Sequence, residues 1–257
     1  MAFEDQGSSS LAVHLDYTLL KPDAPLEEIK LRCQHAAQLG LHGVSVHSSR
    51  VAAANLILED SEVKVGCVVG FPFGAPDSDV KRFETEVAID LGADEISLVL
   101  NPIHLKDGQP KRLFRELRDV VEAAETRPVK AVFCQGLFSE QEAQQAIELV
   151  RESGVGVIEL LGGVRPEPLS PEDFMKLKAS CPEGFQFKVT GPIMRQSEAL
   201  GFLKAGVNWI GTPEPGRVLE DDEIEDYTHV IPVYTFDTTG PVSQWRDVQT
   251  GIVIQDW

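Results

Sequence analysis

Lys188 is the residue in this chain whose type and position point most directly to chemistry. It stands in the middle of the run 185–190, where aromatic and β-branched residues alternate as they do in a strand. A strand of an α/β domain is buried on both faces, so a lysine there requires a carboxylate partner or a lowered pKa. An amine of lowered pKa attacks carbonyl carbons. The structural alternative is an amine that pairs with a carboxylate or extends past the strand end.

Alternating strands and helices are predicted around this lysine. The strands are expected at residues 12–15, 43–46, 63–69, 95–100, 129–134, 157–161, 185–190 and 209–211. The helices are expected at residues 26–39, 49–58, 77–91, 113–124, 139–152, 171–179 and 197–205. Ser139 and Glu142 predict a capping box at the start of one helix.

This alternation predicts a parallel sheet with right-handed crossovers. Eight such units in about 210 residues predict a closed (β/α)8 TIM barrel forming a single domain. The alternative, an open doubly wound sheet, lacks a GxGxxG turn after the first strand. The function of a barrel lies at the C-terminal ends of its strands.

The composition limits the partners of this domain. The chain has 257 residues, 42% of them hydrophobic, and a net charge of −18 with a pI near 4.7. Such acidity argues against nonspecific binding of nucleic acid or anionic membranes, and no apolar run is long enough to span a membrane. The N-terminus lacks the apolar segment of a signal peptide, and the four cysteines show no CxxC spacing. We therefore expect a cytoplasmic protein with reduced cysteines.

Four segments at expected strand ends, taken in order, resemble the deoxyribose-phosphate aldolase family. They are LDYTLLKP at 15–22, GFPFG at 70–74, ADEISLVLN at 93–101 and FKVTG at 187–191. The resemblance extends over about residues 12–218. It implies a class I aldolase barrel, metal-independent and without another cofactor. It also implies a Schiff base with acetaldehyde as the donor and glyceraldehyde 3-phosphate as the acceptor.

Two charged positions of that family differ here. Where the family carries its Schiff-base lysine, in VKTSTG, this chain reads VIELLGG, which places Glu159 at the position of the nucleophile. The proton-relay aspartate of the ADEID motif corresponds to Ser97. Lys188 matches the family's second lysine, which lowers the pKa of the nucleophile, and Asp16 is also retained. A carboxylate cannot form an imine, so the resemblance leaves the chemistry open.

The last strand end differs from the family as well. The family's GTSSG reads GTPEPG at 211–216, where two prolines remove amide donors and Glu214 would repel a phosphate. Pro192 also replaces a glycine of the preceding loop. Arg165 and Arg217 lie near these loops and could supply positive charge, although each is as readily a solvated surface arginine. We therefore expect negligible cleavage of 2-deoxyribose 5-phosphate.

Two interpretations of Lys188 and Glu159 remain, since on adjacent barrel strands they would meet inside the barrel. In the first, Lys188 is the imine-forming or acid/base residue of a divergent carbon–carbon lyase acting on a small carbonyl substrate, with Glu159 and Asp16 as partners. A neighbouring carboxylate raises the pKa of an ammonium, which opposes the imine. In the second, the pair is structural and the protein is a non-catalytic pseudo-aldolase that binds or scaffolds. A genuine deoxyribose-phosphate aldolase is a third alternative.

Several other residues are candidates for substrate binding. They are Ser97, Cys134, His47, Thr190, Arg165 and Arg217. Cys134 ends a predicted strand and His47 follows one, and their structural alternatives are a core thiol and a loop imidazole. No HxH or HExxH spacing supports a metal site, so no metal is expected.

The ends of the chain are expected to lie outside the barrel. We assign residues 1–11 to a flexible N-terminus, 12–220 to the aldolase-like barrel and 221–257 to a C-terminal extension. The extension carries Tyr234, Phe236 and Trp245, whose large apolar area favours packing on the barrel or on a second subunit. A homodimer is therefore one open expectation.

Overall fold

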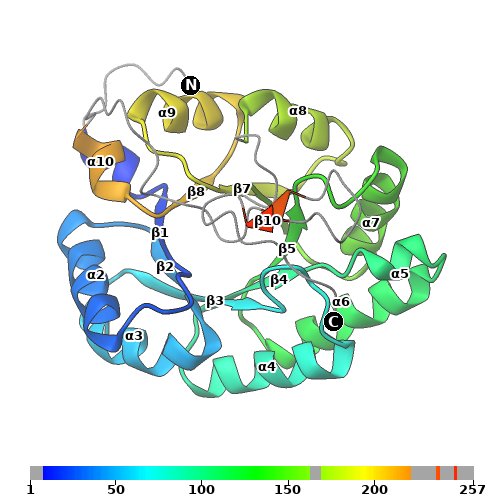
Figure 1. Ribbon diagram of the computed structural model, residues 1–257, viewed down its shortest axis with the longest axis horizontal. Coiled ribbons are helices and arrows are strands. Elements are labelled where there is room, and N and C mark those ends of the chain that lie inside the picture. Colours follow the sequence, from blue (N-terminus) through cyan, green and yellow to red (C-terminus); the bar gives the residue numbers. More distant parts are fainter. Residues whose placement is uncertain (1–7, 163–168, 221–235, 238–245, 248–257) are drawn as a thin grey trace.

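Eight parallel strands close into a barrel in the computed structural model of this protein, and the first strand pairs with the last (Figure 1). The structure describes residues 8–162, 169–220, 236–237 and 246–247. The barrel strands are β1 (Leu15–Leu19), β2 (Gly43–His47), β3 (Lys64–Val69), β4 (Glu95–Val99), β5 (Val129–Cys134), β6 (Val157–Leu161), β7 (Gln186–Thr190) and β8 (Trp209–Thr212). This architecture confirms the predicted (β/α)8 TIM barrel.

Helices surround the strands on the outside of the barrel (Figure 1). They are α1 (Ser8–Ala12), α2 (Leu26–Leu39), α3 (Val51–Ile57), α4 (Ser78–Asp90), α5 (Ile103–Lys106), α6 (Pro110–Ala123), α7 (Glu140–Glu152), α8 (Pro171–Ala179), α9 (Gln196–Ala205) and α10 (Pro215–Glu220), with a 3-10 turn η1 (Ser48–Arg50). The predicted capping box of Ser139 and Glu142 begins α7. Within the described part of the chain, no helix is long and apolar enough to cross a membrane.

The first strand lies later in the chain than its predicted position at residues 12–15. Residues 8–12 form α1, whose Leu11 is buried, and β1 starts only at Leu15. The reason is that Tyr17 and Thr18 suit a strand, whereas the preceding segment docks as a helix. Asp16 consequently lies within the barrel wall. The short helices α5 and α10 were also not predicted, and α1 falls in the segment expected to be flexible.

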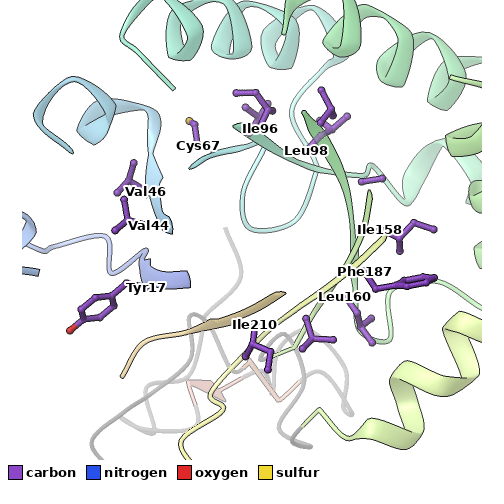
Figure 2. Close-up of a cluster of buried hydrophobic side chains, with 14 of the residues drawn as sticks. Tyr17, Val44, Val46, Cys67, Ile96, Leu98, Ile158, Leu160, Phe187 and Ile210 are labelled. Carbon is purple, nitrogen blue, oxygen red and sulfur yellow. The ribbon is translucent and has the colours of Figure 1, made fainter. Parts of the chain in front are cut away.

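Successive side chains along each barrel strand point alternately outward, toward the helices, and inward, into the barrel. The outward-pointing side chains are mainly apolar. Figure 2 shows the outer set, in which Ile96, Leu98, Ile158, Leu160 and Phe187 come from β4, β6 and β7. These side chains belong to the main hydrophobic core. The residues between them in sequence, such as Ser97, Glu159 and Lys188, therefore point into the barrel.

A short antiparallel pair lies in the C-terminal extension. It consists of β9 (Phe236–Asp237) and β10 (Arg246–Asp247). Tyr234 and Trp245 lie outside the described residues. Packing of the extension on the barrel or on a second subunit stays a prediction.

Candidate active site

Lys188 occupies the centre of β7, and its closest partners come from three other strands. Its Nζ lies 2.5 Å from Asp16 Oδ2 on β1 and 3.8 Å from Glu159 Oε1 on β6. The same Nζ donates a hydrogen bond of 3.3 Å to Ser45 Oγ on β2, across the barrel. Exposed fractions of the Lys188, Asp16 and Glu159 side chains are only 1%, 1% and 5%. The structure thus brings together the three residues expected to carry the chemistry.

The two carboxylates keep Lys188 charged. Burial alone would lower the pKa of its amine, but Asp16 and Glu159 outweigh burial and raise this pKa above its ordinary value. Burial likewise opposes ionisation of Asp16, yet Lys188 and Lys130 hold the pKa of that carboxyl below its ordinary value. The pair is therefore an ammonium and a carboxylate at neutral pH. This state disfavours a neutral, nucleophilic Lys188.

Glu159 is held by two hydroxyl groups as well as by the lysine. Ser97 Oγ donates to Glu159 Oε2 at 2.8 Å, and Thr190 Oγ1 donates to Glu159 Oε1 at 2.6 Å. Gly211 makes room for Thr190, because a Cβ at this glycine would lie 2.3 Å from Thr190 Oγ1. Ser97 and Thr190, both expected at the site, therefore fix the direction of the Glu159 carboxylate.

Asp16 depends on a glycine of the neighbouring strand. Gly43 pairs with Asp16 in the β1–β2 register, and a Cβ at Gly43 would lie 3.0 Å from Asp16 Oδ1. Asp16 Oδ1 is buried and has no hydrogen-bond donor among the described residues. The absence of a side chain at Gly43 therefore leaves room for this buried oxygen.

A second buried ion pair lies beside the first, and the sequence interpretation missed it. Lys130 of β5 donates to Glu95 of β4, and their side chains are 2% and 10% exposed. The sequence contains a pattern that could have identified this pair, because Lys130 interrupts the apolar run 129–134 as Lys188 interrupts its own strand. Ser45 was also missed, because a serine in a short strand has no distinctive pattern.

The remaining predicted residues differ in their relation to the cluster. Cys134 is buried at the end of β5 and donates to the Pro72 carbonyl at 3.3 Å, while burial, aided by Glu159, raises the pKa of its thiol to about 12. His47 ends β2, and its Nε2 lies 3.0 Å from the Leu20 carbonyl oxygen. Neither contacts Lys188 directly.

The two predicted arginines do not join the centre. Arg217 lies on α10, and no hydrogen bond or ion pair connects it to the described residues of the barrel interior. Arg165 lies outside the described residues. Any contribution of these arginines to an anion site stays a prediction.

Glu214, in the loop after β8, already has partners for its backbone amide and its carboxylate. The Glu214 amide donates to Thr212 Oγ1 at 3.1 Å, and the Glu214 carboxylate lies 3.8 Å from Arg32 Nη1. Arg32 in turn donates to the Tyr17 hydroxyl. In the described part of the chain, no group of three or more His, Cys, Asp or Glu side chains is arranged to hold a metal ion.

A parallel eight-stranded barrel with a buried lysine–carboxylate cluster defines the class of the protein, and comparison with known proteins gives the family. No family model matches the chain. The deoxyribose-phosphate aldolase of Thermococcus gammatolerans is 34% identical over 82% of this chain and 95% of its own length. The corresponding enzyme of Caldanaerobacter subterraneus is 32% identical over 86% of this chain and 97% of its own length.

A solved structure agrees with these sequence relatives. The tetrameric deoxyribose phosphate aldolase of Aeropyrum pernix superposes with a TM-score of 0.76, at 26% identity, over 83% of this chain and 91% of its own. The chain belongs to the deoxyribose-phosphate aldolase family. The resemblance drawn from its four sequence segments is thereby confirmed.

Proposed function

We propose that the protein is an aldolase-like carbon–carbon lyase in which Lys188 acts as an ammonium acid and Glu159 as a carboxylate base, without an imine. The observation that supports this most is the 2.5 Å contact between Lys188 Nζ and Asp16 Oδ2. An amine held protonated does not attack a carbonyl carbon. It does donate a hydrogen bond to a carbonyl oxygen and stabilises the negative charge that develops there.

The proposed substrate is a small β-hydroxy carbonyl compound. Glu159 removes the hydroxyl proton, the bond between the α- and β-carbons breaks, and an aldehyde or ketone leaves. The electron pair passes to the α-carbon and the carbonyl oxygen as an enolate, which the Lys188 ammonium stabilises. Protonated Glu159 then returns its proton to the α-carbon, so the second carbonyl product forms and both residues regain their starting states.

The residues around this pair have positioning roles in the proposal. Asp16 and Ser45 hold the Lys188 ammonium from two sides of the barrel. Ser97 and Thr190 hold the Glu159 carboxylate through hydroxyl donors. Fixed charges in a site that excludes water need no reorganisation when the reaction occurs.

We further propose that 2-deoxyribose 5-phosphate is a poor substrate. The loop after β8 carries the Glu214 carboxylate, and the Glu214 amide already donates to Thr212. Glu214 would therefore repel a phosphate in this loop, and its amide is already engaged. Turnover should therefore fall at least about tenfold below the usual enzyme range of roughly 1–10³ s⁻¹.

The decisive experiment combines turnover with trapping. The protein is incubated with 4-hydroxy-4-methylpentan-2-one, 4-hydroxypentan-2-one and 3-hydroxybutanal, each with and without borohydride, and followed by product release and intact mass. We expect cleavage of at least one compound and no added mass. Glu159→Gln should reduce this turnover by roughly 10²–10⁴-fold, whereas the exposed Glu59→Gln should leave it unchanged.

Each other outcome rejects the proposal in a different way. A borohydride adduct on the peptide that contains Lys188 would show an imine. Retained turnover in Glu159→Gln would remove Glu159 as the base. Absence of cleavage across the panel would favour a non-catalytic protein.

A non-catalytic pseudo-aldolase is the second candidate, and one observation favours it. Each Glu159 oxygen accepts a hydroxyl hydrogen bond, and Lys188 already has three partners. A buried pair whose lysine and glutamate are both held in this way can be purely structural. In that case the barrel would bind a small carbonyl compound or a partner without converting it.

We also propose that the protein works in the cytoplasm as a homodimer. Leu31 on α2 and Leu56 on α3 are 60% and 71% exposed, and these two helices pack side by side. Apolar side chains at such exposure suit an interface. Light scattering at micromolar concentration tests this, and a monomer mass would contradict it.

A further inference from the structure

The barrel interior has one apolar side, which the proposed reaction does not use. Val99, Val132, Cys134 and Leu161 form a hydrophobic cluster separate from the main core, and they are 1%, 2%, 3% and 7% exposed. We call these four residues the apolar wall. Phe71 and Leu137, which follow β3 and β5, pack against it.

Strand register places the apolar wall next to the proposed catalytic pair. Val132 pairs with Glu159, and Leu161 pairs with both Cys134 and Thr190. Val99 and Leu161 each come two residues after an inward-pointing residue, Ser97 and Glu159, so they point into the same interior. The wall therefore begins beside Glu159 and continues to the C-terminal strand ends, where barrels bind their substrates.

The opposite side of the interior carries polar groups next to Val68 of β3, which pairs with His47 and Ser97. Ser45 contacts Lys188 from β2, and His47 ends the same strand. Thr190, which borders Leu161 of the apolar wall, adds a hydroxyl group that donates to Glu159. A molecule that reaches Lys188 and Glu159 thus meets an unbroken apolar surface on the side of the apolar wall and a mixed surface, with Ser45, His47 and Val68, on the other side.

Charges of the described residues near the wall do not favour an anion. Lys81 is the cation that acts on Cys134, but it has no exposed surface, and its Nζ lies 2.9 Å from Glu116 Oε2. It also donates to the Val99 carbonyl at 2.8 Å. Its charge is neutralised behind the strand rather than presented to the interior.

We propose that the apolar wall receives the non-reacting hydrocarbon of the substrate, so that the site selects neutral aliphatic carbonyl compounds over anionic ones. This inference rests on the proposed function for the position of the reacting carbonyl. It adds the substrate class, which Lys188 and Glu159 alone do not define. Burial of each methylene group against the wall strengthens binding, whereas a carboxylate or phosphate placed there would lose its hydration without gaining a cation.

Binding of two unreactive ketones tests this separately from catalysis. Hexan-2-one and 4-oxopentanoate share a methyl ketone and a similar length, and neither has the β-hydroxyl group needed for cleavage. Their dissociation constants are measured by ligand-observed NMR on the full chain. We expect hexan-2-one to bind at least about tenfold more tightly, the equivalent of burying roughly two methylene groups.

Variants of the wall make the test specific. Val99→Thr keeps the shape of the side chain and should weaken hexan-2-one about threefold to tenfold, through the cost of burying a hydroxyl group. Leu161→Lys should reverse the preference toward 4-oxopentanoate. The matched Leu91→Lys, at the exposed C-terminal end of α4, should change neither constant.

The outcomes separate this inference from the proposed function. Equal affinity for both ketones, no binding of either, or hexan-2-one binding that is unaffected by both wall variants would overturn the inference. If Leu161→Lys does not fold, Val99→Thr alone decides the result. Selective hexan-2-one binding without cleavage of any β-hydroxy compound would support the apolar wall and reject the lyase.

Discussion

Lys188 lies inside the barrel, and Lys81 lies outside it, where α4 and α6 meet the end of β4. Both side chains are buried and both amines contact a carboxylate at less than 3 Å. Lys188 has two carboxylate neighbours, Asp16 and Glu159, whereas Lys81 has one close partner, Glu116. This difference in the number of carboxylate partners determines how strongly each amine is held in its protonated form.

The pKa values of the two amines move in opposite directions. Burial lowers the pKa of Lys81 below its ordinary value, and Glu116 does not fully offset this effect. At Lys188 the two carboxylates outweigh burial and raise the pKa. The second carboxylate thus keeps the buried amine of Lys188 protonated. A protonated amine can act as an acid, but it cannot attack a carbonyl carbon to form an imine.

The surroundings of the Lys81 pair indicate a structural role. Lys81 Nζ donates to the Val99 carbonyl at 2.8 Å, and the Asn101 amide donates to Glu116 Oε1 at 3.2 Å. Gly70 permits this arrangement, because a Cβ there would lie 2.7 Å from Lys81 Cε. The pair thereby fastens two outer helices to the β4 strand end that carries part of the apolar wall.

The largest expected effect is on catalysis at Lys188. Lys188→Met should reduce turnover of the best β-hydroxy carbonyl substrate by roughly 10²–10⁴-fold, because the enolate loses its ammonium donor. The measurement is kcat on folded protein, with the fold checked by circular dichroism. A normal kcat in Lys188→Met would contradict the catalytic role that distinguishes Lys188 from Lys81.

The next effect is on stability at Lys81. Lys81→Met should lower the free energy of unfolding by roughly 3–5 kcal/mol, because it leaves the Glu116 carboxylate buried without its ammonium. Urea denaturation measures this change. The double variant Lys81→Met with Glu116→Leu should recover much of the loss, and kcat per folded molecule should stay close to that of the unsubstituted protein. No recovery in the double variant would show that Lys81 stabilises by packing alone.

The sequence predicted the inner cluster better than the outer pair, for a physical reason. A lysine or glutamate inside a strand of apolar, β-branched residues violates the expected pattern, so Lys188 and Glu159 are conspicuous. Barrel order then places their strands side by side. Lys81 and Glu116 lie on amphipathic helices, where charged residues are expected on the solvent face.

The same reasoning explains two further differences from the prediction. Only the packing of α4 against α6 shows that the charged positions Lys81 and Glu116 are buried. The register of β1, which places Asp16 beside Gly43, depends on where α1 ends. Sequence periodicity does not locate that point to within a residue or two.

The smallest effect, and the most direct comparison of the two lysines, is the pH dependence of stability. The folded-state pKa of Lys188 is raised above 10.5, so its contribution to stability is complete below pH 10.5 and is lost as the pH rises through the folded-state pKa. The folded-state pKa of Lys81 is lowered below 10.5. Between that lowered pKa and 10.5 the unfolded chain binds more protons, so this group makes stability increase with pH.

Curves of unfolding free energy from about pH 2 to about pH 12, which extend into both windows, should therefore separate two variants by the sign of their difference from the unsubstituted protein. Lys81→Met with Glu116→Leu should remove the alkaline gain, whereas Lys188→Met should remove the alkaline loss. On the acid side, Asp16 has a pKa lowered below 3.8, so its contribution is present above pH 3.8 and is lost as the pH falls through the folded-state pKa. Asp16→Asn should therefore reduce the fall in unfolding free energy at acid pH. Parallel alkaline slopes in the two lysine variants would mean that both amines have the same environment, which the two-carboxylate neighbourhood of Lys188 argues against.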